Sequence, residues 1–230
     1  MRPCMAHAPP HGSRVDVDER SVEALVATIL GGPKGPKTMK AAMAVAEELL
    51  AVCGGLAGLA KVDEDELTGL LTGGAPFRAE IAARALAAAF ELGRRVTIAE
   101  ATVPEFFGGS ADAAAWAIPR LGSLSHEELW MVAVDGRSRL RATRRVAKGG
   151  LHGLGVKAAD TLRLAIRSAA SGFLLVHNHP SGDPTPSPQD VHFTREVAAA
   201  AATVGVPLLD HVVVTRDAFA TVPFEGGGSA

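Results

Sequence analysis

The chain has 230 residues, of which 47% are hydrophobic and 21% are charged, and its formal net charge is −2. A chain of this length buries roughly 70% of its unfolded surface on folding, so it needs neither disulfides nor a structural metal for stability. Its 25 acidic residues nearly balance its 23 basic residues, which excludes a protein-wide field that would recruit nucleic acid or an anionic membrane.

The cysteines and the apolar segments narrow the class of protein further. Cys4 and Cys53 form no Cys-x-x-Cys pair, so the sequence predicts neither a disulfide framework nor a thiolate zinc site. No apolar run has the length of a signal peptide core or of a membrane span. We therefore expect a soluble, cytoplasmic protein.

The N-terminal part of the chain is predicted to be helical. Residues 1–20, which contain Pro9-Pro10, are expected to form a disordered arm. Over residues 21–95, apolar side chains recur at helical spacing, and turns rich in glycine or proline separate the segments. The predicted helices cover residues 22–30, 38–51 and 77–92, with a further helix that begins at the acidic cluster 63–66.

Residues 96–122 contain several glycines and prolines, and we interpret them as a linker around a short helical piece at residues 111–116. From residue 123 onward, short apolar strands alternate with helices, which is typical of an α/β domain. Strands are predicted at residues 129–134, 173–176 and 208–215, and helices at 160–170 and 188–203. Asp135-Gly136 predicts a hairpin turn after the first strand. The domain is predicted to end at residue 224, before a flexible tail at 225–230.

His177 and His179 directly follow an apolar strand and are separated by one residue. Side chains at i and i+2 of an extended segment point to the same side, so both imidazoles can reach one ion. A loop rich in proline then returns Asp190 toward them. Two imidazoles and one carboxylate leave a fourth tetrahedral position open for water, as in catalytic zinc sites. The three residues are therefore predicted to bind Zn²⁺, which lowers the pKa of bound water to about 7 in favourable sites.

The segment Ser187-Pro188-x-Asp190 also has the pattern of a helix start. Serine is a favoured N-cap, proline is favoured at the first helical position, and an acid suits the third. On its own the segment favours capping over metal binding. The two interpretations are compatible, because the cap would fix the turn that aims Asp190.

The sequence His-Asn-His-Pro-Ser-Gly-Asp-Pro-x-Pro-Ser-x-x-Asp over residues 177–190 resembles the motif of the RadC family, the bacterial branch of the JAMM/MPN metalloenzymes. The resemblance extends from about residue 22 to residue 224 and includes Asp210-His211 in a later strand. It implies an α/β fold, with an MPN-type mixed β-sheet flanked by helices in residues 123–224. It also implies a small all-α domain, similar to a helix-hairpin-helix, before that sheet. The activity it implies is that of a zinc-dependent hydrolase, which cleaves a peptide or isopeptide bond with metal-activated water.

The resemblance further implies a glutamate that opens a strand and acts first as a general base and then as a general acid. Glu127, eight residues before Asp135, matches this glutamate. Glu128 would face the opposite side of a regular strand. The alternative for Glu127 is a solvent-facing acid at a strand start. By the same resemblance, Ser187 helps to stabilise the oxyanion.

The chain departs from the family pattern at positions that concern recognition. Ala158-Ala159-Asp160 stands where the family has Pro-Arg-Glu, and Gly155 stands where it commonly has serine. In the hairpin element near residues 65–92, Pro76 has no backbone N–H for a DNA phosphate, and the usual lysine is absent. We therefore expect this element to pack or to contact protein, and we expect DNA binding to be weak or absent.

Three classes of function remain open. They are a JAMM-type hydrolase acting on a peptide or an isopeptide-linked protein, a DNA-repair-associated nucleic-acid-binding module, and a non-catalytic MPN scaffold. The scaffold is disfavoured because the chain keeps all three predicted ligands and a matching glutamate. The basic residues between 137 and 148 can contact phosphates or an acidic partner, although a solvated hairpin is favoured. We therefore predict the hydrolase, and the sequence leaves a homo-oligomer open.

Overall fold

The computed structural model describes residues 20–31, 36–72, 78–149 and 156–225. The predicted arm (apart from Arg20), the hairpin turn around Pro76, Gly155 and the tail from residue 226 lie outside these ranges. Among the described residues, no helix combines the length and the apolar character needed to cross a bilayer. The chain divides into two compact units, residues 1–89 and 90–230.

The N-terminal unit is all-helical, as predicted. Its helices are α1 (Val22–Gly31), α2 (Pro36–Val52), α3 (Leu56–Leu59), α4 (Glu64–Leu71) and the first part of α5 (Ala79–Glu100). These helices bury apolar side chains that include Val26, Leu30, Leu49, Leu59, Leu67, Leu71 and Leu86. Asp63 caps α4, because its Oδ1 accepts a hydrogen bond from the N–H of Glu66 at 2.8 Å. The acidic cluster therefore begins a helix, as the sequence indicated.

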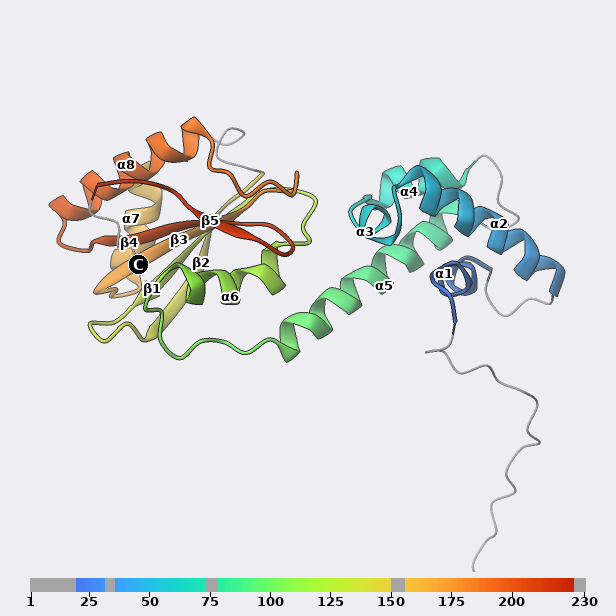
Figure 1. The fold of residues 1–230 in the computed structure, drawn as a ribbon, viewed down its shortest axis with the longest axis horizontal. Helices are drawn as coiled ribbons and strands as arrows, with labels where there is room; N and C mark the ends of the chain where they lie inside the picture. The colour runs from blue at the N-terminus through green and yellow to red at the C-terminus, as the bar shows by residue number, and fades with distance from the viewer. Residues whose placement is uncertain (1–19, 32–35, 73–77, 150–155, 226–230) are drawn as a thin grey trace, which may run out of the picture. The chain divides into compact units, whose positions relative to one another are not determined.

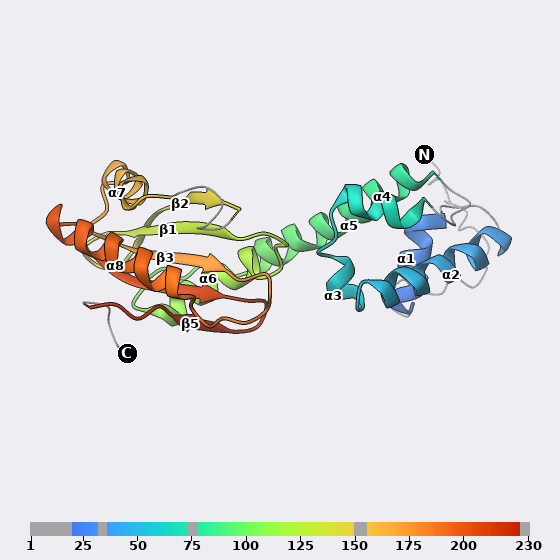
Figure 2. The same cartoon turned by 90° about the horizontal axis from the view of Figure 1, so that it is seen from above.

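The C-terminal unit is a mixed five-stranded sheet with helices on both faces, which confirms the predicted α/β fold (Figure 1). Its strands are β1 (Glu128–Val134), β2 (Leu140–Lys148), β3 (Gly172–Asn178), β4 (Leu208–Val214) and β5 (Phe219–Thr221). The strand order is β2-β1-β3-β4-β5, with β3 and β4 parallel and the other neighbours antiparallel. Helix α6 (Ser110–Leu121) packs on one face of the sheet, and α7 (Ala158–Arg167) and α8 (Pro188–Thr203) cover the other (Figure 2).

The register between β1 and β3 decides which side chains share a face. Leu129 pairs with His177, and Met131 pairs with Leu175. Paired residues of antiparallel strands point to the same face, and the faces alternate along each strand. The odd-numbered residues of β1 and β3 therefore face α7 and α8, where Leu129, Met131 and Leu175 join one core cluster. The even-numbered residues, such as Val132, join the cluster beneath α6.

Residues 96–122 contain more structure than the predicted linker. Helix α6 occupies residues 110–121, and Trp116 and Phe107 belong to the core cluster on the α6 face of the sheet. The glycines and prolines mark the borders of this helix: Gly109 precedes its first residue, and Pro119 lies in its last turn. Composition alone suggested a linker, because the burial of this segment depends on contacts with strands far away in the sequence.

Helix α5 also continues beyond its predicted end at residue 92, and reaches Glu100. Glycine is unfavourable within a helix, by about 1 kcal/mol relative to alanine. Ion pairs span Gly93, because Arg94 and Arg95 each place Nε 2.8 Å from a carboxylate oxygen of Glu91. The helix therefore runs through the glycine.

Replacing Trp116 tests whether α6 is part of the core. Trp116→Ala is expected to lower the free energy of unfolding by about 3–5 kcal/mol, because the side chain is only 4% exposed and packs edge-on against Trp130. Ile166→Ala on α7, at a position that is 55% exposed, is the control and should change stability by less than about 0.5 kcal/mol. Urea denaturation followed by circular dichroism measures both. Equal stability of the two variants would contradict a core role for α6.

Candidate metal centre

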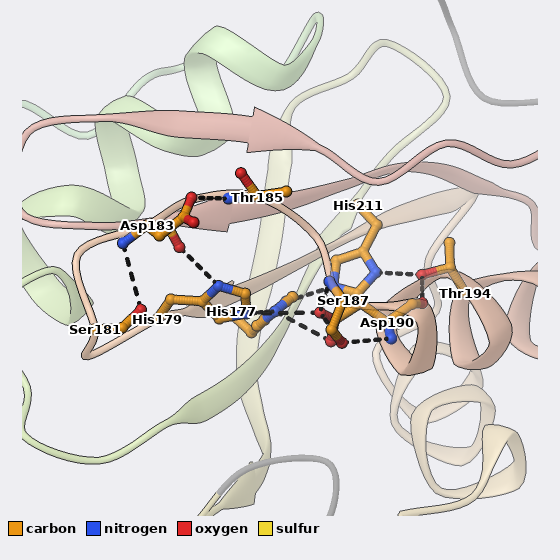
Figure 3. A network of polar contacts seen from close by, with 9 residues as sticks. All are labelled: His177, His179, Ser181, Asp183, Thr185, Ser187, Asp190, Thr194 and His211. Carbon is orange, nitrogen blue, oxygen red and sulfur yellow. Dashed lines mark hydrogen bonds and ion pairs between the residues drawn. The ribbon is translucent and has the colours of Figure 1, made fainter.

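His177 and His179 lie at the carboxyl end of β3, on the face of the sheet that α8 covers (Figure 3). Their Nε2 atoms are 3.0 Å apart. His177 is 2% exposed. The backbone N–H of His179 donates to the carbonyl of Val214 at 3.0 Å, which holds the residue beside the end of β4. The strand therefore directs both imidazoles to one place.

Asp190 enters the site from the first turn of α8. Ser187 is the N-cap of this helix, and Pro188 is its first residue. The backbone N–H of Ser187 donates to Asp190 Oδ2 at 2.7 Å, and the N–H of Asp190 donates to Ser187 Oγ at 3.1 Å. This reciprocal capping box fixes the turn that points the carboxylate at the histidines. Asp190 therefore takes part in the cap of α8 and also lies beside the two histidines.

The hydroxyl of Ser187 is already used within this capping box. It donates its hydrogen to Asp190 Oδ2 at 2.6 Å. A hydroxyl has only one hydrogen to donate. In this conformation Ser187 therefore orients the carboxylate, and it would have to leave Asp190 in order to donate to an oxyanion.

The donor atoms of the three residues lie close enough together to bind one metal ion. Bonds of about 2.0–2.1 Å to nitrogen and oxygen separate neighbouring ligand atoms by about 3.3 Å in a tetrahedron. The two Nε2 atoms are 3.0 Å apart, Asp190 Oδ1 lies 3.3 Å from His177 Nε2, and Asp190 Oδ2 lies 3.6 Å from His179 Nε2. Within the part of the chain that the structure describes, these are the residues that can hold a metal ion together. Two imidazole nitrogens and one carboxylate oxygen also suit zinc chemically.

Each histidine has a hydrogen-bond partner at Nδ1, which fixes the nitrogen that faces the metal. His179 Nδ1 donates to the backbone carbonyl of Asp183 at 2.9 Å. The lone pair of a neutral His179 is therefore on Nε2, which points toward Asp190. The loop rich in proline thus orients His179 as well as returning the chain to α8.

A longer chain of hydrogen bonds fixes His177. Its Nδ1 is 2.8 Å from Nε2 of His211, and Nδ1 of His211 is 2.6 Å from Oγ1 of Thr194. The hydroxyl of Thr194 donates its hydrogen to the backbone carbonyl of Asp190, which can only accept.

The Thr194 hydroxyl determines which atoms donate and which accept in this series of hydrogen bonds. Nδ1 of His211 must donate to Oγ1 of Thr194, since the hydrogen of that hydroxyl is used elsewhere. A neutral His211 then accepts at Nε2 from Nδ1 of His177. The lone pair of His177 is left on Nε2, which faces the other two ligands. His211 and Thr194 therefore favour the tautomer of His177 whose Nε2 is available as a metal ligand.

The pKa shifts of the site describe it without a metal ion, when Nε2 of a histidine can carry a proton and donate it to Asp190. Burial alone would raise the pKa of Asp190, but hydrogen bonds with His177 and His179 outweigh it and hold the pKa well below its ordinary value. The hydrogen bond with Asp190 raises the pKa of His179, against the effect of burial. Complete burial lowers the pKa of His211 well below its ordinary value, and the neighbouring His177 acts in the same direction. The site thus combines a permanent carboxylate with a neutral supporting imidazole.

Glu127 lies immediately before β1. Continuing the β1–β3 register by two residues places it opposite His179, on the α8 side. The negative charge of Glu127 contributes to the raised pKa of His179. Glu128 is on the other side, where its carboxylate accepts hydrogen bonds from Nε1 of Trp130 at 2.8 Å and Nη1 of Arg145 at 2.9 Å. Of the two glutamates, Glu127 shares the face of the histidines.

Sequence reasoning assigned no role at the site to Thr194 or His211. A signal for Thr194 exists, because it is four residues after Asp190 on α8 and therefore lies on the same side of the helix. His211 is a polar residue in the middle of an apolar strand. Its contact with His177 depends on the pairing of β3 with β4, in which Leu175 is the partner of His211.

The family model and the similar proteins all point to the same family. The model of the RadC-like JAB domain family matches residues 107–226. A UPF0758 protein of Desulforudis audaxviator is 33% identical over 185 residues, which are 80% of this chain and 78% of that protein. A UPF0758 protein of Chloroflexus aurantiacus is 31% identical over 186 residues, with the same shares of the two chains. A UPF0758 protein of Desulfitobacterium hafniense is 30% identical over 204 residues, or 89% of this chain and 86% of that protein.

The hydrogen-bond chain behind His177 predicts a measurable loss of metal affinity. Thr194→Val preserves the shape of the side chain but leaves Nδ1 of His211 without its acceptor. Zinc affinity, measured by competition with a chromophoric chelator, is expected to fall by about 10- to 100-fold. Thr203→Val is the matched control, because Thr203 donates to the carbonyl of Ala199 on the same helix but is exposed. Equal affinity of the two variants would remove Thr194 from the metal site.

Proposed function

Because the chain belongs to the RadC-like JAB domain family, we propose that it is a zinc-dependent hydrolase of the JAMM type that cleaves a peptide or isopeptide bond. The observation that carries the proposal is the convergence of two imidazole nitrogens and one carboxylate at the end of β3. The β1–β3 register, continued by two residues, puts Glu127 on the same face of the sheet. The ligands are His177, His179 and Asp190. Three protein ligands leave a position for water and substrate, which is the arrangement of catalytic rather than structural zinc.

In this mechanism zinc supplies a Lewis acid that makes water nucleophilic near neutral pH and polarises the substrate carbonyl. Glu127 accepts the proton of the attacking water on its carboxylate. It then delivers that proton to the nitrogen of the leaving amine, so that the same group serves as base and as acid. The amine leaves neutral, and the new carboxyl product carries the oxygen of the water.

Ser187 has two tasks in the proposal. In the resting state its hydroxyl orients Asp190, as the 2.6 Å hydrogen bond indicates. Stabilisation of an oxyanion requires rotation of the hydroxyl away from Asp190, while the backbone N–H of Ser187 keeps its own hydrogen bond to the same carboxylate at 2.7 Å. The carboxylate therefore keeps a donor when the hydroxyl turns toward the substrate.

A peptide-bonded partner is a better candidate than nucleic acid. Several arginines of the β2 hairpin are engaged within the protein: Arg145 pairs with Glu128, Arg141 Nε donates to the carbonyl of Ser168, and Arg139 lies over the ring of Phe106. Non-specific DNA affinity depends on clustered cations that are free to replace counterions. We therefore propose a peptide or an isopeptide-linked protein as the substrate.

Metal stoichiometry gives the first test. Purified wild-type protein, incubated with zinc and then dialysed, is expected to retain one zinc per chain. His177→Ala should retain none, because two of the three donors cannot hold the ion at low free zinc. His192→Ala is the control, since His192 lies exposed on α8 and pairs with Glu196. Atomic absorption measures the zinc, and full occupancy in His177→Ala would refute the site.

The two neighbouring glutamates give the second test. Glu127→Gln is expected to keep zinc and to lose roughly 10²–10⁴-fold in hydrolysis, because an amide cannot accept the proton. Glu128→Gln, on the opposite face, should retain most of the activity. Initial rates are measured on a panel of peptides and lysine-linked isopeptides. Wild-type rates in Glu127→Gln, or inactivity confined to Glu128→Gln, would contradict the assignment.

A further inference from the structure

Asn178 separates the two histidines but binds a different part of the chain. It is the last residue of β3 and is 1% exposed. Its Oδ1 accepts a hydrogen bond from the backbone N–H of Glu128 at 2.8 Å, and its Nδ2 donates to the backbone carbonyl of His126 at 2.9 Å. One carboxamide thus binds the residue before Glu127 and the residue after it.

The backbone of Glu127 itself is held from the opposite side. Its carbonyl accepts a hydrogen bond from the N–H of Gly149, just beyond the end of β2, at 2.7 Å. Consecutive residues of a strand direct their N–H and C=O groups to opposite neighbours. The segment before β1 is therefore paired on both sides, by Gly149 in place of β2 and by the Asn178 side chain in place of β3. A side chain is needed there because β3 ends at Asn178.

We propose that Asn178 is a positioning residue whose carboxamide holds the carboxylate of Glu127 beside the metal ligands. The inference rests on the proposed function, in which Glu127 transfers the proton. Asn178 is covalently joined to both histidines, so one residue sets the distance between the ligands and the proton-transferring group. Because side chains alternate along the strand, the Asn178 side chain points away from the face of the two histidines and does not enter the metal site.

The task requires an asparagine rather than a similar polar residue. The carboxamide has both a donor and an acceptor, like the peptide group that it replaces. An aspartate at position 178 would accept from Glu128 but could not donate to the carbonyl of His126. An alanine would lose both hydrogen bonds. Misplacing a catalytic group by about 1 Å can cost on the order of 100-fold in rate.

The first part of the test measures kinetics of the full chain loaded with zinc. Asn178→Asp and Asn178→Ala are expected to bind one zinc per chain, since both histidines keep their own partners. Their kcat should fall roughly 100-fold with KM unchanged, as for loss of a transition-state interaction. Adding Glu127→Gln to either variant should lower kcat by a smaller factor than it does in the wild type. The reason is that the Asn178 variants have already displaced the carboxylate that Glu127→Gln removes.

Thr215→Val controls for a general loss of stability. Thr215 is fully buried at the end of β4, and its Oγ1 accepts a hydrogen bond from the N–H of Ala218 at 3.2 Å. The variant loses a buried hydrogen bond at the same end of the sheet, and the hydroxyl that it removes pairs with Ala218 rather than with residues 126–128. Its kcat is expected to stay at the wild-type value.

The second part needs no substrate. In the metal-free protein, Asn178→Ala should speed hydrogen exchange of the Glu128 amide by at least about fivefold, and Asn178→Asp should not, because it keeps the acceptor. In the cobalt-loaded protein, the visible spectrum at one fixed pH should change in Glu127→Gln and change in the same way in both Asn178 variants. Thr215→Val should keep the wild-type spectrum.

The outcomes separate this inference from the proposed function. If the zinc-loaded wild type cleaves no member of the panel, the proposed function fails, and the cobalt spectra still decide whether Asn178 positions Glu127. A wild-type spectrum and a wild-type kcat in both Asn178 variants overturn the inference. Loss of zinc from these variants also overturns it, because Asn178 would then support the ligands instead.

Discussion

Successive side chains of a β-strand point to opposite faces, and the candidate metal centre depends on this alternation at the end of β3. His177 and His179 fall on the α8 face, where the capped first turn of α8 supplies Asp190. Asn178, between them, reaches the backbone on either side of Glu127. Three consecutive residues therefore supply two candidate ligands and a carboxamide that pairs with the backbone around the group proposed to move the proton. A slip of one residue in the β1–β3 register would exchange Glu127 for Glu128.

The polar groups buried at the site are also supplied with hydrogen-bond partners. A buried donor or acceptor without a partner costs about 1–3 kcal/mol. Among the described residues, the buried side-chain atom without a partner is Oγ1 of Thr161 on α7, which belongs to none of the site's hydrogen-bond chains. The satisfied network behind the ligands is extensive: His211 and Thr194 lie behind His177, the carbonyl of Asp183 behind His179, and Ser187 behind Asp190. These partners orient the ligands before any ion is present, which reduces the reorganisation that binding requires.

The sequence predicted the fold class and the three residues that converge at the candidate metal centre, because the signals for both are local. The spacing of the histidines and the capping pattern before Asp190 can be read within fourteen residues, and the change from helical to alternating periodicity marks the α/β region. Helix α6 was interpreted as part of a linker, because its burial against the sheet depends on strands far along the chain. The partners of His177 were missed for the same reason: His211 is 34 residues away and reaches it only through strand pairing. Residue type alone could not distinguish a buried supporting histidine from any other core histidine.

The most direct test of the account is zinc-edge anomalous diffraction from crystals of the zinc-loaded protein. The account predicts one anomalous peak per chain, bound by Nε2 of His177, Nε2 of His179 and the carboxylate of Asp190, with the Glu127 side chain on the open side of the ion. A peak bound through Nδ1 of either histidine, a peak elsewhere, or no peak in fully loaded crystals would contradict it.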